Sequence, residues 1–288
     1  MTSTLIPSNN PNSTQATKPT ADNAVRTSHN VPAARSNVDV AKALPTTLKA
    51  EWIKLSSLRS NGALIALAFV VSAFVSWAVG TYVTDEGVLT IAEVFTFSTV
   101  FTAVFAAVGG ILLFSSEAQH GTLAPALTAQ PARWVIVMSK TIVAAGFGAV
   151  LGAVGLLAGL GGAAVAGLSM GVTTGMWATA AWATSFAALA AVLGLGVGMI
   201  ARHSTAAVSG LLVWWLVVEN LLTVFVAERF SRFLPFVAGN SLATSGEGAG
   251  PGEATELALT TTENAMIFGG YAAAALLIGT VLLYRRDN

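Results

Sequence analysis

Six apolar runs of about 20 residues or more recur along the chain. Each is long enough for an α-helix, which rises 1.5 Å per residue, to cross a hydrocarbon core of about 30 Å. Apolar residues make up 54% of the sequence and charged residues only 10%, whereas a soluble domain usually carries about a quarter charged residues. We therefore predict an all-α integral membrane protein with six transmembrane helices. The predicted spans are residues 62–82, 91–114, 134–168, 176–200, 205–227 and 265–284.

Several classes of function are excluded by what the sequence lacks. The formal net charge is zero, so there is no electrostatic basis for binding nucleic acid. There is no cysteine, which excludes disulfides, cysteine-ligated zinc and thiolate catalysis. The three histidines are far apart in sequence, and neither a phosphate-binding G-x-x-x-x-G-K-[ST] loop nor an HExxH motif occurs. We expect no cofactor, no metal and no enzymatic activity in this chain.

Basic residues predict the orientation, because Lys and Arg next to membrane spans stay on the cytoplasmic side. With six spans, both termini lie on one side, and this side collects most of the basic residues. We therefore place both termini in the cytoplasm and the chain in the cytoplasmic membrane. Residues 1–43 are predicted to be a disordered tail, residues 44–61 an amphipathic helix and residues 62–288 the membrane domain. The basic residues of the inner side are Lys42, Lys49, Lys54, Arg59, Arg133, Lys140, Arg202, Arg285 and Arg286.

Residues 45–60, PTTLKAEWIKLSSLRS, have the pattern of a basic amphipathic helix. Leu48, Trp52 and Leu55 share one helical face, and basic residues lie elsewhere. Such a helix is expected in the inner headgroup plane, held by apolar burial and anionic lipid. It serves either as a simple anchor or as a helix that flanks a moving bundle.

Residues 115–133, SSEAQHGTLAPALTAQPAR, link the second and third predicted spans on the cytoplasmic side. Ser116 and Gln119 have the spacing of a capping box, and Gly121 is expected to break that turn. Thr122 then caps a second short helix through Leu123 and residues 127–128. This link is either a docking surface for a soluble partner or an ordinary capped connection.

One acidic residue, Glu219, falls inside the fifth predicted span, where a carboxylate costs several kcal/mol unless it is paired, protonated or hydrated. Trp215 lies one turn earlier on the same face. Together they form a candidate substrate path for a cationic or amphipathic molecule. The alternative is a protonated Glu219 that is hydrogen-bonded to a neighbouring helix.

Two stretches resemble the ABC-2-type permeases of actinobacterial ABC transporters. Residues 50–60, AEWIKLSSLRS, are similar to the family's E-W-x-K-L-R-S-L-R-S stretch, with Ser56 where a basic residue is usual. Residues 114–133 are similar to its E-x-x-x-G-T-(I/L)…L-(T/S)-x-x-P-x-R segment, and Ala124 and Pro125 depart from it.

The resemblance implies a permease subunit that works with a separate ATP-binding subunit. It implies that residues 45–60 are the elbow helix, represented by Trp52, Lys54, Leu55 and Arg59. It also implies that residues 117–128 are the coupling helix that receives motion from the ATPase. The residues assigned to ATPase coupling are Glu117, Gln119, His120, Gly121, Thr122 and Leu123.

Because the family works as two permeases with two ATPases, the resemblance implies a homodimer or a pairing with a second permease. The expected function is therefore an ATP-driven exporter component. The runner-up is an ATPase-independent secondary transporter that uses Glu219 as its coupling acid, and a membrane assembly or tethering protein is a third possibility. No residue selects a substrate.

Overall fold

A computed structural model describes residues 40–83, 90–123, 125, 128, 132–171, 173–244 and 259–286. All of the described residues belong to one compact unit, residues 38–288. The predicted disordered tail and most of residues 124–131 lie outside the described residues.

The described chain contains six helices that are long and apolar enough to cross a membrane, as predicted. The fifth of these, Ser204–Phe225, is continuous but changes character along its length. It consists of α8 (Ser204–Val213), a π-helical turn η1 (Trp214–Val218) and α9 (Glu219–Phe225). The other five are α2 (Arg59–Tyr82), α4 (Thr99–Gln119), α6 (Arg133–Val165), α7 (Met176–Ala201) and α12 (Thr261–Arg286). Further helices among the described residues include α1 (Val40–Ser57), α3 (Ile91–Val94), α10 (Glu228–Ser231) and α11 (Pro235–Thr244).

The second predicted span, residues 91–114, differs from the structure at both ends. Its start is a separate helix, α3, followed by a turn in which the Thr99 amide donates to the Thr96 carbonyl at 2.9 Å. Its end continues to Gln119, and the hydroxyls of Ser115 and Ser116 bond carbonyls one turn earlier in the same helix. The predicted capping box at Ser116 and Gln119 is therefore wrong, since Ser116 lies inside α4 and starts no helix.

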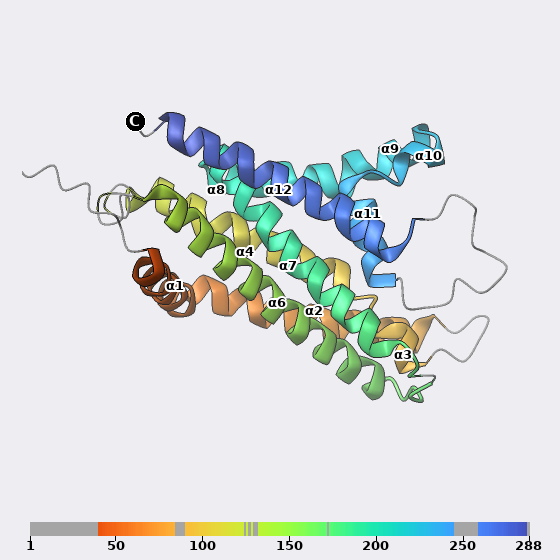
Figure 1. The fold of residues 1–288 in the computed structure, drawn as a ribbon. Coiled ribbons are helices and arrows are strands. Elements are labelled where there is room, and N and C mark those ends of the chain that lie inside the picture. The colour runs from red at the N-terminus through yellow and green to blue at the C-terminus, as the bar shows by residue number, and fades with distance from the viewer. Residues whose placement is uncertain are drawn as a thin grey trace, which may run out of the picture. The chain divides into compact units, whose positions relative to one another are not determined.

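Small residues let the helices at the centre of the bundle approach closely. Helix α7 packs against α4, α6 and α12 (Figure 1). A Cβ atom added at Gly194 of α7 would overlap the carbonyl oxygen of Ala107, and one added at Gly110 of α4 would overlap that of Ala191. Transmembrane helices pack in this way because they gain contact and dispersion energy when backbones come close. Alanine and glycine thus hold the α4–α7 pair together.

One end of the bundle gathers segments that are distant in sequence. The Ser204 hydroxyl at the start of α8 donates to the Gln119 side chain at the end of α4, at 2.7 Å. Arg133 at the start of α6 donates to the carbonyl of Tyr284 at 3.4 Å, and Arg286 donates to the carbonyl of Ile200 at 3.2 Å. The C-terminal ends of α4, α7 and α12 and the N-terminal ends of α6 and α8 therefore lie together.

Helix α1 packs against α6 and is not one of the six apolar helices. Leu55 is buried in the core, and Leu48 packs against the same cluster. Trp52, which the sequence pattern placed on the same face, is half-exposed, and the buried residue on that side is Glu51. The inner face of α1 therefore carries a carboxylate that the amphipathic pattern did not predict.

Candidate functional site

Four charged side chains from three helices form a closed ring of alternating sign. Lys140 of α6 places its Nζ atom 2.8 Å from Glu51 Oε2 of α1 and 2.9 Å from Glu117 Oε2 of α4. Lys54 of α1 completes the ring, with its Nζ atom 3.0 Å from Glu51 Oε1 and 3.2 Å from Glu117 Oε1. Each carboxylate thus contacts both ammonium groups, and the four formal charges sum to zero.

Most of this ring is out of contact with solvent. Lys140 is 1% exposed and Glu51 is 3% exposed, whereas the Lys54 side chain is 47% exposed and forms the outer edge. Lys140 lies seven residues into α6, which is about 10 Å along the helix. Removing charges from water costs several kcal/mol per ion, and only well-placed partners offset this cost. The ring is therefore tolerated only while all three helices keep their positions.

The ring shifts the pKa of the two charged groups of α1. Burial raises the pKa of the Glu51 carboxyl, but the ammonium groups of Lys140 and Lys54 outweigh burial, and the net pKa lies below its ordinary value. Burial likewise lowers the pKa of Lys54, but hydrogen bonding to Glu51 and the charge of Glu117 outweigh it, and its net pKa is raised. Both groups are therefore held in their charged forms around neutral pH.

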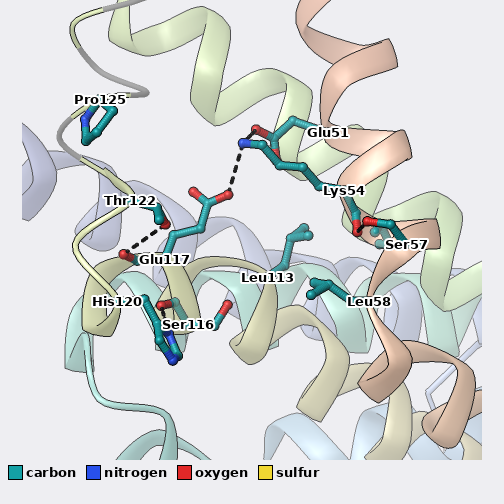
Figure 2. Close-up of a pocket in the computed structure, with 11 residues that line it drawn as sticks. Glu51, Lys54, Ser57, Leu58, Leu113, Ser116, Glu117, His120, Thr122 and Pro125 are labelled. Carbon is teal, nitrogen blue, oxygen red and sulfur yellow. Dashed lines mark hydrogen bonds and ion pairs between the residues drawn. The ribbon is translucent and has the colours of Figure 1, made fainter.

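A hollow of about 680 Å³ adjoins the outer edge of the ring. Figure 2 shows Lys54 of α1 and Glu117 of α4 pointing toward each other beside this hollow. Leu55, Leu58 and Leu113 form part of its apolar wall. Residues of α1, of the end of α4 and of the segment after α4 line the hollow. The Lys54–Glu117 pair bridges α1 and α4 beside it.

The predicted coupling residues occupy the end of α4 and the turn after it. Glu117 belongs to the ring, and Gln119 bonds Ser204. The His120 Nδ1 atom lies 2.7 Å from the Ser116 carbonyl oxygen. Gly121 has φ of +72°, the left-handed conformation that ends helices, so the predicted break at this residue is confirmed.

Beyond this turn, Thr122 bonds back to the carbonyl of Glu117 through its amide at 3.1 Å and its hydroxyl at 3.4 Å. Leu123 is buried against the core. Residue 127, which was predicted to continue a short helix, lies outside the described residues.

Of the predicted elbow residues, only Lys54 takes part in the ring. Leu55 is buried in the core, Trp52 is half-exposed, and Arg59 is exposed at the start of α2.

Sequence reasoning missed the two most buried members of the ring, Glu51 and Lys140. Lys140 had a usable signal, because an ionisable residue inside a predicted span indicates function by default. The charge pattern places it only among the basic residues of the inner side. Glu51 had a weaker signal, as the acidic residue of the AEWIKLSSLRS stretch. Their pairing required the packing of α1 on α6, which no local pattern encodes.

Trp215 and Glu219 lie together at a different place, against α11. The indole of Trp215 stacks on the ring of Phe236 with centroids 3.9 Å apart. Glu219 Oε1 accepts a hydrogen bond from the Val237 amide at 2.7 Å, in the first turn of α11. A carboxylate is favourable there, because the first amides of a helix have no partner within the helix. The hydrogen bond to a neighbouring helix is therefore present, while the protonated form of Glu219 and its role in a substrate path stay predictions.

The ring links α1, α4 and α6 electrostatically. Within the described part of the chain, no cluster of three or more His, Cys, Asp or Glu residues could hold a metal ion. Neither a protein-family model nor a curated protein sequence matches this chain.

Proposed function

We propose that this chain is the membrane-spanning permease subunit of an ATP-driven ABC exporter of the ABC-2 type. A separate ATP-binding subunit would supply the energy. One observation carries the proposal. The two stretches that resemble this family are about 60 residues apart in sequence, and they contribute Glu51, Lys54 and Glu117 to a single ring of charges.

In this proposal α1 is the elbow helix and lies in the cytoplasmic headgroup layer. Its outer side supports this placement, because Trp52 and Ile53 are about half exposed and apolar side chains of a surface helix are stabilised by lipid. The same end of the bundle carries Arg133 and Arg286. Basic residues next to spans favour the cytoplasm, so both chain termini are placed there.

The ring gives the proposed coupling a physical route. We infer that the ATP-binding subunit docks on residues 117–128 and moves them when it closes on ATP. Glu117 is paired with Lys54 and Lys140, so its displacement breaks two ion pairs in a poorly solvated site unless α1 and α6 follow. Motion of the docked segment is thereby transmitted to two helices of the bundle. Two permease chains, either identical or from two genes, complete the unit.

The experiment compares ATP hydrolysis and transport of reconstituted complexes that carry Glu117→Gln or wild-type permease. Glutamine has nearly the same shape as glutamate but no charge, so this substitution removes the ion pairs of residue 117 with Lys54 and Lys140. Mutations in coupling networks change coupling by about 0.5–2 kcal/mol, so we expect about a two- to thirtyfold fall in permease-dependent ATP hydrolysis.

Glu263→Gln is the matched control, because Glu263 lies in the first turn of α12, at the opposite end of that helix from Arg286. Hydrolysis and transport that are unchanged by Glu117→Gln would contradict the coupling role.

A further inference from the structure

The apolar run that the sequence predicted as one span, residues 91–114, is broken near its start. Helix α3 ends at Val94, and α4 begins at Thr99. The Thr99 amide donates to the carbonyl of Thr96 and not to that of Phe95, its partner in an unbroken α-helix. Phe95 is 1% exposed, and no backbone amide of the described residues bonds its carbonyl. A buried carbonyl that a helix break releases needs a partner from elsewhere.

Three oxygens from different segments converge beside Gly159 of α6. A Cβ atom added at this glycine would lie 2.7 Å from the Phe95 carbonyl oxygen and 3.1 Å from Ser76 Oγ of α2. It would also lie 3.2 Å from Ser98 Oγ, at the end of the break. Both serines are fully buried. Because Gly159 has no side chain, the three oxygens surround a point that a methyl group would otherwise occupy.

These oxygens are only weakly hydrogen-bonded to one another. Ser98 Oγ donates to the Phe95 carbonyl at 3.5 Å, and Ser76 Oγ donates to the Val94 carbonyl at 3.4 Å, whereas hydroxyl donors usually lie about 2.5–3.0 Å from their acceptors. Ser98 occupies the N-cap position of α4, but its hydroxyl caps no amide. The Thr99 hydroxyl beside it is buried and has no partner within the described part of the chain. Buried hydroxyls are normally well paired, so the break holds oxygen lone pairs that protein donors leave unused.

The kind of oxygen at the break indicates the class of ligand. Carbonyl and hydroxyl oxygens are hard donors that suit hard cations. Divalent cations are usually held by carboxylates, whereas the three converging oxygens are neutral, which favours a single positive charge. In transporters, the carbonyls of broken membrane helices coordinate Na⁺ in this way. The sequence, which lacks clusters of His and Cys, predicts no metal, but carbonyl ligands leave no pattern in a sequence.

We propose that the α3–α4 break binds one alkali cation, Na⁺ or K⁺, through the Phe95 carbonyl oxygen and the hydroxyl oxygens of Ser76 and Ser98. A hydroxyl can donate its hydrogen and bind an ion through its oxygen at the same time, so Ser76 keeps its bond to Val94. Water completes the coordination. The bound ion joins the break to α2 beside the bare backbone of Gly159.

This site lies far from the ring of charges. Gly159 is about 28 Å farther along α6 than Lys140, and α3 lies at the opposite end of the bundle from α1 (Figure 1). The cation site therefore does not rest on the proposed transporter function, and either one can be wrong without the other.

Thermal unfolding of the purified full chain in detergent tests the proposal. The chain is measured in NaCl, KCl or choline chloride at equal ionic strength. A ligand that binds only the folded state raises stability with its concentration. We expect the unfolding midpoint to rise with NaCl or KCl and not with choline chloride, and the salt that acts at the lower concentration identifies the preferred ion. Equal midpoints in all three salts would overturn the proposal.

Two variants locate the ion. Ser76→Ala and Ser98→Ala each remove one ligand, and each should raise the apparent dissociation constant of the stabilising cation about tenfold or more, the scale of one lost contact to a charged group. Ser72→Ala is the matched control, because Ser72 is equally buried one turn earlier in α2 and pairs with Thr102 at 3.1 Å. It should lower the midpoint and leave the dissociation constant unchanged. A cation effect that neither ligand variant weakens would place the ion elsewhere and overturn the proposal.

A direct readout does not depend on the folding of any variant. Equilibrium dialysis of the wild-type chain against radioactive Na⁺ and K⁺ should show one bound ion per chain that excess choline does not displace. Absence of a bound ion at concentrations that saturate the thermal effect would contradict the site.

Discussion

At the scale of single residues, we expect the loss of Lys140 to cost most among the four residues of the ring. It is the most buried charge of the ring and contacts both carboxylates. Replacing it with Met would leave Glu51 and Glu117 close together with only the half-exposed Lys54 as a counter-charge. Breaking a buried ion pair by removing one partner costs about 3–5 kcal/mol, so we expect Lys140→Met to lower the free energy of unfolding by about that amount in mixed detergent micelles.

Lys49→Met is the matched control, because Lys49 is exposed on α1 and surface substitutions stay within about 0.5 kcal/mol. In the double variant Lys140→Met with Glu117→Gln, the loss of unfolding free energy should be smaller than the sum of the losses in the two single variants, because the two residues interact directly. Strict additivity, or a Lys140→Met variant as stable as the wild type, would show that the ring is not formed.

The lowered pKa of Glu51 predicts how stability depends on pH. Around its ordinary value of 4.5, the unfolded chain binds this proton more readily than the folded chain, so stability rises with pH there. The contribution of Glu51 is complete above about pH 4.5 and is lost as the pH falls through the lower, folded-state pKa. The stability difference between wild type and Glu51→Gln should therefore be constant from pH 5 to 8 and shrink below pH 4.5, as followed by thermal unfolding. A difference that grew toward acid pH would have the wrong sign.

At the scale of helices, the close crossing of α4 and α7 rests on glycine. We expect Gly194→Ala to destabilise the bundle by about 1–3 kcal/mol, because the new methyl group would force the backbones apart at Ala107. Gly270→Ala in α12 is the control, since its added Cβ atom meets nothing within 4 Å. There the helix should gain about 0.5–1 kcal/mol from the lower entropy of alanine. If unfolding measurements found Gly194→Ala more stable than Gly270→Ala, they would contradict the close crossing of α4 and α7.

The helices themselves were predictable from apolar length, because a span that is buried in lipid needs about 20 apolar residues whatever its neighbours are. Their interruptions were less predictable. The turn between α3 and α4 interrupts an apolar run, and it depends on contacts such as the bond from the Ser76 hydroxyl to the carbonyl of Val94. The site was half predictable: Lys54 and Glu117 stood in recognisable stretches, whereas Glu51 and Lys140 became visible only when three helices were packed together.

At the scale of the whole molecule, one end of the bundle joins the segment that the proposal assigns to docking to the membrane helices. The end of α4, the ring and α1 lie there, together with the C-terminal end of α12, which is bonded through Arg133 and Arg286. Trp215, Glu219 and α11 form a second packed region, away from the ring's contacts. Under the proposed function, motion of the docked ATP-binding subunit would reach the membrane helices at the end that carries the ring.

The central claim is tested most directly by purifying the tagged full chain from its native membrane in a gentle detergent and identifying what accompanies it by mass spectrometry. The account predicts a stoichiometric ATP-binding subunit that is lost when residues 117–128 are replaced by a Gly/Ser linker. It also predicts that this subunit is retained when the exposed Lys49 is changed to Met. A chain that purifies without any ATP-binding subunit would contradict the account and would favour the ATPase-independent carrier with Glu219 as its coupling acid.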